Sequence, residues 1–113
     1  MNKRQEKLKV ALATYTPEEY ARLHATADDA SELDATWEEW FKGVEEARSR
    51  LALQGIECVN VPIEIAALQQ FCLEHNLKNT GETRANYAAE MLRKQQQQQR
   101  QQLSKKLKKK RKK

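Results

Sequence analysis

Eight cations at the end of the chain have the clearest chemistry in this sequence. They are Lys105, Lys106, Lys108, Lys109, Lys110, Arg111, Lys112 and Lys113. A cluster of this density neutralises phosphate groups and releases their condensed counterions, which gives affinity for DNA or RNA without reading the base sequence. No aromatic residue follows Tyr87, so bases cannot stack on the segment. We therefore expect contacts to the phosphate backbone that are steeply salt-sensitive and weakly selective.

The same cations also suit other roles. They match a nuclear-import signal in a eukaryote, an anchor for anionic lipid headgroups, a solubilising tail, or a segment that folds back over its own acidic body. A glutamine run at 95–99 and 101–102 comes before them. The run is too short to drive aggregation, which favours a spacer over a coiled-coil or self-association contact.

Cys72 and His75 lie three residues apart and so share one face of a predicted helix. The pair could form half of a zinc site completed across a dimer, or a thiol beside a base. A closed zinc site needs four ligands, and only Cys58 and His24 remain to supply the other two. The apolar neighbours of Cys72 favour a packed thiol instead. We therefore assign no metal ligand, no cofactor and no catalytic residue.

Four acidic pairs are the remaining candidates for acid–base chemistry: Glu18-Glu19, Asp28-Asp29, Glu38-Glu39 and Glu45-Glu46. The first and third fall in the first turns of predicted helices, where carboxylates complement the helix dipole. Solvated carboxylates are the favoured interpretation for all four pairs. The chain also has no glycine-rich phosphate loop, nucleophile elbow or His-Glu-x-x-His motif. We predict that the protein is not an enzyme.

The cations are set apart from an acidic body. Residues 93–113 hold eleven of the 21 Lys and Arg and none of the 16 Asp and Glu, so residues 1–92 carry a net charge of −6. A chain of 113 residues has room for one domain. We divide it into a polar, basic lead-in (1–7), an acidic globular domain (8–92) and a Gln/Lys-rich basic tail (93–113) that is partly helical or disordered.

Helix starts are marked by two Thr-x-x-Glu motifs, at Thr16 and Thr36. The apolar stripe behind the second motif predicts a helix over 36–54, with Trp37 and Trp40 as core anchors. A third helix is expected after Pro62.

A fourth helix is expected after Asn79 and Thr80, which can cap it. Ala85, Ala88, Ala89 and Leu92 form its predicted inner face. No Gly or Pro interrupts the chain from Glu82 to its end, so this helix can continue into the tail.

Residues 56–61 form the best strand candidate, because they are rich in β-branched residues and lie between Gly55 and Pro62. A strand needs a partner. The partner is either residues 8–14, which alternate in polarity and are favoured, or the same strand of a second subunit.

These elements predict an α+β fold: a small single domain of about four helices packed on a two-stranded β element, with the last helix extending into the basic tail. An all-α fold is the alternative if residues 8–14 are helical. No run of about 18 apolar residues exists, so no membrane span is expected. Reduced thiols and the lack of a secretory signal favour the cytoplasm, or the nucleus in a eukaryote.

From these features we expect a small non-enzymatic binding protein. Its acidic body would contact a protein, and its polybasic tail would contact DNA, RNA or another polyanion. The alternative is a protein-interaction or inhibitor module, similar to antitoxins or DNA mimics, in which the acidic body is the working surface and the tail is incidental. A homodimer is also compatible with either role.

Overall fold

The structure is a computed structural model that describes the backbone of residues 8–111 and the side chains of residues 8–107. The chain order is β1 (Leu8–Thr14), α1 (Pro17–Thr26), the short 3-10 helix η1 (Ala30–Glu32), α2 (Trp37–Leu53), β2 (Ile56–Pro62), α3 (Ile65–His75) and α4 (Gly81–Arg111). This confirms the α+β prediction of four helices and a two-stranded element, and excludes the all-α alternative. The predicted lead-in at 1–7 lies outside the described residues.

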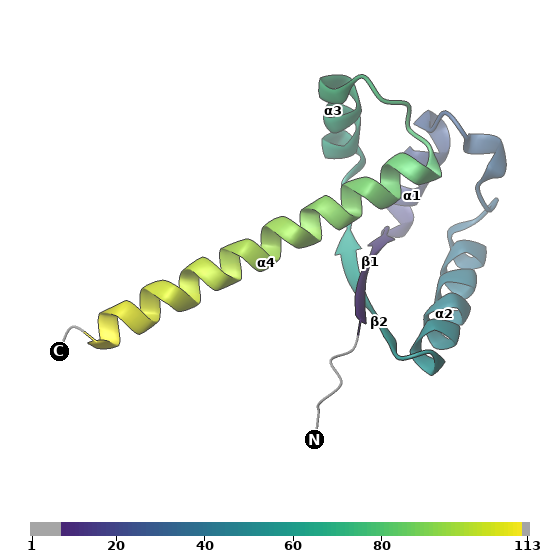
Figure 1. Ribbon diagram of the computed structural model, residues 1–113. Coiled ribbons are helices and arrows are strands. Elements are labelled where there is room, and N and C mark those ends of the chain that lie inside the picture. The colour runs from purple at the N-terminus through teal and green to yellow at the C-terminus, as the bar shows by residue number, and fades with distance from the viewer. Residues whose placement is uncertain (1–7, 112–113) are drawn as a thin grey trace.

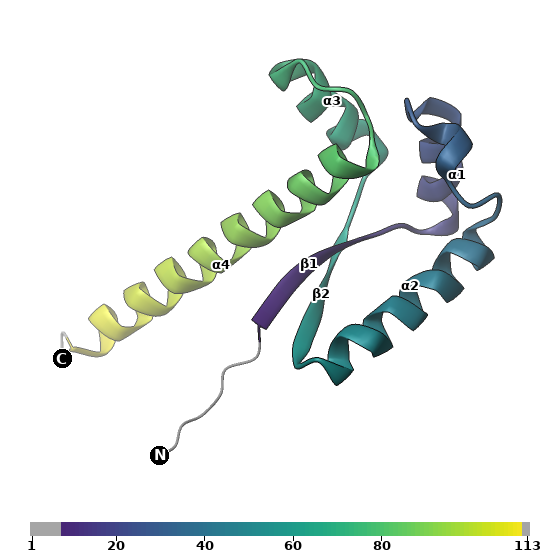
Figure 2. The same cartoon turned by 45° about the vertical axis from the view of Figure 1, so that its right-hand side comes forward.

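The two strands run parallel, with Leu8 opposite Ile56 and Thr14 opposite Pro62. Parallel neighbours need a crossover connection, and here α1, η1 and α2 supply it. α2 packs against β2 and α4 packs against β1, so the small sheet lies between the two longest helices (Figure 2). Pairing within the chain confirms 8–14 as the strand partner.

Local sequence explains where most elements begin and end. The Oγ1 atoms of Thr16 and Thr36 accept hydrogen bonds of 3.1 Å from the amides of Glu19 and Glu39, as the two motifs predict. Gly55 takes a φ of 82° just after α2, a conformation that glycine adopts without strain. Asn76 ends α3 in the left-handed region at φ 55°.

The start of α3 is capped by a residue from another helix. Glu64 supplies no side-chain cap. Instead, Oε1 of Glu19 on α1 accepts a 2.9 Å hydrogen bond from the amide of Ile65. This contact fixes the beginning of α3 against α1, across 46 residues of sequence.

The core lies at the carboxyl ends of the strands, where α1, α3 and the first turns of α4 meet. Leu23, Ile65 and Leu68 are its fully buried large side chains, and Tyr20, Ile63 and Ala88 are among those packed around them. α2 contributes no fully buried residue. Trp37 and Trp40 pack against the core from its side and stay half-buried, so the prediction that they are core anchors is only partly right.

α4 continues well beyond the body. Figure 1 shows it crossing the sheet and then running away from it, with its C-terminal half clear of the other elements. The helix has 31 residues and the molecule is 57 Å in its longest dimension. None of the helices between residues 8 and 111 combines the length and apolarity that a membrane span requires.

Candidate functional site

The second half of α4 is the best-defined candidate site. Leu92 still packs against the core cluster, but every residue from Arg93 to Leu107 is exposed. Leu103 and Leu107 are 60% and 54% exposed, because no other described element reaches them. We call residues 93–111 the basic arm. The arm is a continuous helix that leads away from the body, so the alternative in which it folds back over its own acidic surface does not fit the described residues (Figure 1).

The structure places part of the predicted polyanion site. Lys105 and Lys106 are exposed on the arm, about 100° apart around the helix axis. The backbone of Lys108, Lys109, Lys110 and Arg111 continues the same helix. Lys112 and Lys113 lie outside the described residues.

Few of the arm's charges are neutralised within the described chain. Arg93 lies 3.8 Å from Glu90, in an exposed contact at the base of the arm. No other ion pair among the side chains of residues 8–107 involves Lys94, Arg100, Lys105 or Lys106. These cations therefore face solvent with their charge uncompensated by the body.

The arm is held in place at the opposite end of α4 by a buried ion pair. Nη1 and Nη2 of Arg84 donate to Oδ1 and Oδ2 of Asp29 at 3.0 Å each. Nη1 also donates to Oδ1 of Asn79 at 3.0 Å. Arg84 is 7% exposed. The guanidinium holds the pKa of the Asp29 carboxyl below its ordinary value, mainly through these hydrogen bonds.

Asp29 also caps the first turn of α4, and its neighbour Asp28 binds the segment just before that helix. Oδ2 of Asp29 accepts from the Gly81 amide at 2.9 Å, and Oδ2 of Asp28 accepts from the Asn79 amide at 2.7 Å. The prediction of a solvated pair is therefore wrong for Asp29, whose side chain is largely buried, whereas Asp28 is exposed although its carboxylate accepts from a backbone amide. Each carboxylate accepts from a backbone amide, and Asp29 also pairs with Arg84.

The inner face of α4 is the predicted one only in part: Ala88 is in the core and Leu92 packs against it, as predicted. Thr83, Arg84, Tyr87 and Ala88 are buried, whereas Ala85 and Ala89 are exposed. The apolar pattern favoured Ala85 and Ala89 because it assigned Arg84 to solvent. The only sequence clue to Arg84 was its spacing, three and four residues before Tyr87 and Ala88, which puts all three on one face.

The cysteine and histidine residues do not form a reactive centre in the described structure. Cys72 is buried and burial raises the pKa of its thiol. His75 is exposed and its ring lies against Phe71, with centroids 4.5 Å apart. Both cysteines are free thiols. Among residues 8–107, no three His, Cys, Asp or Glu side chains come together as a metal site would need.

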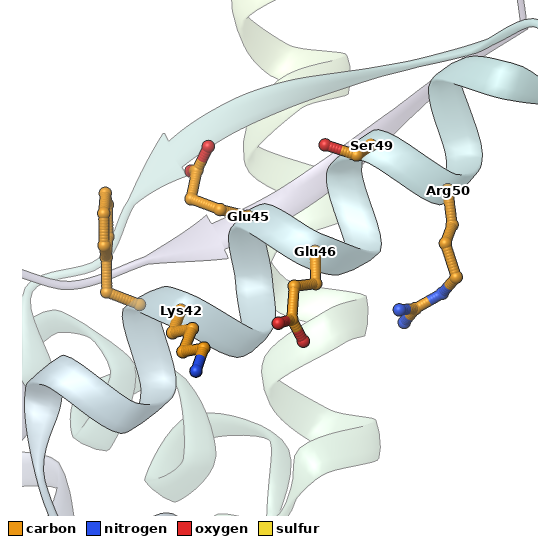
Figure 3. A pocket seen from close by; sticks show the side chains of 6 residues that line it. Lys42, Glu45, Glu46, Ser49 and Arg50 are labelled. Carbon is orange, nitrogen blue, oxygen red and sulfur yellow. The ribbon is translucent and has the colours of Figure 1, made fainter.

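The outer face of α2 bears a shallow hollow of about 640 Å³. Figure 3 shows the side chains of Lys42, Glu45, Glu46, Ser49 and Arg50 lining it, and Phe41 completes the set. All six come from this one helix, so no second element walls the hollow. It carries two cations, Lys42 and Arg50, and two carboxylates, Glu45 and Glu46, so it does not form a single acidic surface.

Comparison of the chain with models of protein families, with curated proteins and with solved structures finds no match. The function is therefore argued from the geometry above.

Proposed function

We propose that the protein is a small non-enzymatic binding protein whose basic arm contacts the phosphate backbone of DNA or RNA. The acidic body anchors the arm and offers a surface for a protein partner. The observation that carries the proposal is the uncompensated charge of an exposed helix that leads away from the body.

Charge separation within one chain supports this assignment. An arm that lay on its own body would neutralise its cations there. The described cations beyond Arg93 have no such partner, so they are free to replace the counterions of a nucleic acid. The body itself has a net negative charge and would repel the same polyanion, which keeps the contact on the arm.

Binding is tested with labelled duplex DNA and single-stranded RNA, titrated with the full chain across a series of salt concentrations. The test variant replaces Lys105, Lys106, Lys108 and Lys109 with glutamine, which keeps the helical propensity of the arm. We expect affinity to fall. The slope of log K against log salt should shrink by about one for each lysine that no longer neutralises a phosphate.

The control replaces two exposed body lysines, Lys42 and Lys78, with glutamine. This control should retain both the affinity and the salt slope of the natural chain. Equal losses per lysine replaced, four in the arm variant and two in the control, would show that total charge, and not the arm, governs binding. No binding by the natural chain at low salt would refute the proposal.

A second candidate function makes the acidic body the working surface, as in an inhibitor of a basic nucleic-acid-binding protein. The exposed acidic residues Glu32, Asp34 and Glu38 near the start of α2 favour it. In that case the arm variant would retain full binding to the basic partner, whereas Glu38→Gln with Glu39→Gln would weaken it.

A further inference from the structure

The sheet ends at β1 with an edge that no described strand covers. β1 and β2 form a two-stranded sheet and have no other strand neighbour within residues 8–111. An open edge presents unpaired N–H and C=O groups, and proteins normally cover or block such edges. β1 has seven residues, no proline and a single charge, that of Lys9. The strand is therefore suited to pairing with another strand.

The hydrogen bonds show which peptide groups face this edge. The carbonyl of Thr14 accepts a 2.9 Å bond from the Ile63 amide, so Thr14 points its peptide groups towards β2. Peptide groups alternate in direction along a strand, so those of Lys9, Ala11 and Ala13 point away from β2.

The outer edge of β2 is different, because α2 supplies a partner for it. By the same alternation, the carbonyl of Cys58 faces away from β1. Nη1 of Arg48 donates to that carbonyl at 3.5 Å, and Nη2 donates to Oδ1 of Asn60 at 2.7 Å. No comparable side-chain contact reaches the outward peptide groups of β1 among the described residues.

A hollow of about 440 Å³ lies beside the first part of β1, at its free edge. Lys9, Val10 and Ala11 from the strand and Ala89 and Leu92 from α4 are among its lining residues. Three consecutive strand residues cannot all point into one face of a sheet, so the hollow lies at the edge itself. It leaves open space for an added strand beside Lys9, Val10 and Ala11.

We propose that β1 pairs antiparallel with β1 of a second copy of this chain, across a two-fold axis at Ala11. The sequence of the strand is self-complementary in this register. Lys9 faces Ala13 of the other copy and Ala11 faces Ala11, and each of these pairs can exchange both N–H···O=C bonds. Val10 then meets Leu12 of the other copy in the closer, non-hydrogen-bonded position, where apolar side chains pack best.

Charge and size also suit this pairing. The Lys9 of each copy faces an alanine, and Glu57 of its own β2 lies opposite on the other side. The pairing therefore brings no like charges together within the sheet. Ala11 and Ala13, which pack against the core cluster, are small enough to let the two copies approach.

The resulting sheet would have four strands in the order β2–β1–β1–β2. An axis perpendicular to the sheet puts both α4 helices on the same face and sends the two basic arms in opposite directions. This inference does not depend on the proposed function, and its test uses no nucleic acid.

The test measures the mass of the full chain by sedimentation at high salt, which screens repulsion between the arms, together with amide hydrogen exchange by NMR. We expect a species of two chains in which the Ala11 amide is protected. Dilution should release that protection, while the Leu12 amide, which faces β2, stays protected.

The variant Lys9→Pro removes an outward N–H from an exposed position and leaves the bonds to β2 intact. Because Lys9 pairs at both ends of the interface, the dimer dissociation constant should rise at least about tenfold. Lys9→Gln is the control and should dimerise as the natural chain does.

Two outcomes would overturn the proposal. One is a single-chain mass at every concentration, with rapid exchange at Ala11. The other is a dimer in which the Ala11 amide exchanges rapidly, which would place the interface elsewhere, for example on the basic arm. If Lys9→Pro fails to fold, the hydrogen-exchange rate of the Ala11 amide in the natural chain still tests the proposal.

Discussion

Arg84 binds Asp29 through two parallel hydrogen bonds of 3.0 Å, and this ion pair joins the loop after α1 to the first turn of α4. The two residues are 55 positions apart in the chain. Paired guanidinium–carboxylate bonds have a fixed planar geometry, so the contact sets the direction of α4 as well as its position. The direction in which the basic arm leaves the body thus depends on a contact at the far end of the same helix.

Asp29→Asn should destabilise the body strongly. The substitution leaves the buried guanidinium without a counter-charge, a change that costs about 3–5 kcal/mol when one partner of such a pair is removed. Urea unfolding of the natural chain and the variant measures the difference. The double variant with Arg84→Met is the control, because it removes both charges and should recover part of the loss. A loss below about 0.5 kcal/mol would show that the pair is solvated.

Acid should weaken the natural chain through the same pair. The pKa of Asp29 is lower in the folded state than its ordinary value of 3.8, so its stabilising effect is fully present above that value. It is lost as the pH falls through the lower, folded-state pKa. The stability difference between the natural chain and Asp29→Asn, followed by urea unfolding, should therefore be constant near neutral pH and shrink below about pH 4. A difference that grows in acid would contradict this assignment.

Glu19→Ala should cost about 1–2 kcal/mol of folding free energy, mainly because it removes the cap from the Ile65 amide at the start of α3. The 2.8 Å ion pair of Glu19 with the exposed Arg22 is lost too and contributes less. Glu18→Ala is a matched control, since Glu18 is the exposed neighbour in the same helical turn. The control should change stability by less than about 0.5 kcal/mol. Equal losses, measured by urea unfolding, would indicate a shared effect on the dipole of α1 instead of a specific cap on α3.

Trp40→Ala tests how far α2 belongs to the core. The Trp40 ring lies 5.3 Å from the ring of Tyr15 and 5.8 Å from that of Tyr20, measured between centroids. Because the side chain is only half-buried, we expect a loss of about 2–3 kcal/mol, below the range for a fully buried tryptophan. Phe41→Ala should cost less, since Phe41 is 44% exposed. The reverse order in thermal or urea unfolding would place Phe41 in a buried interface in solution.

The sequence predicted the elements well because their signals are local. Thr16 and Thr36 cap the helices that their Thr-x-x-Glu motifs predict, and Gly55 lies where the backbone needs a positive φ. The pairing of residues 8–14 with 56–62 could also be predicted, because the sequence offers few other strand candidates.

What the sequence could not supply were contacts between distant polar residues. The pairing of Asp29 with Arg84 and the cap of Glu19 on Ile65 depend on how the helices pack, and each residue has an equally acceptable solvated interpretation. For the same reason the predicted inner face of α4 was partly wrong. A buried arginine can be recognised only when the carboxylate that pairs with it is known. The predicted cations of the arm were easier to identify, since charge density needs no tertiary partner.

Cys72 should be unreactive in the folded protein. Burial raises the pKa of its thiol, so the reactive thiolate is scarce near neutral pH. Alkylation by iodoacetamide, measured in a Cys58→Ser background, should be slow in native buffer and fast in urea. The native rate should still be rising at pH values above 9, the ordinary pKa of the group. Rapid labelling of the folded chain would contradict this prediction and would favour thiol chemistry at Cys72.

Gln98→Pro separates the basic arm from the body. Proline at this position cannot donate to the Lys94 carbonyl and clashes with it, so the helix should end just before the substitution. The residues beyond it pack on no described element and are too few to stay helical alone. Helical circular dichroism should therefore fall while the urea midpoint of the body stays unchanged, and Gln98→Ala should alter neither. A lower midpoint would mean that the arm stabilises the body in solution. With an intact body, the effect of Gln98→Pro on nucleic-acid affinity shows whether the cations act as a disordered cluster or need the helix to present them.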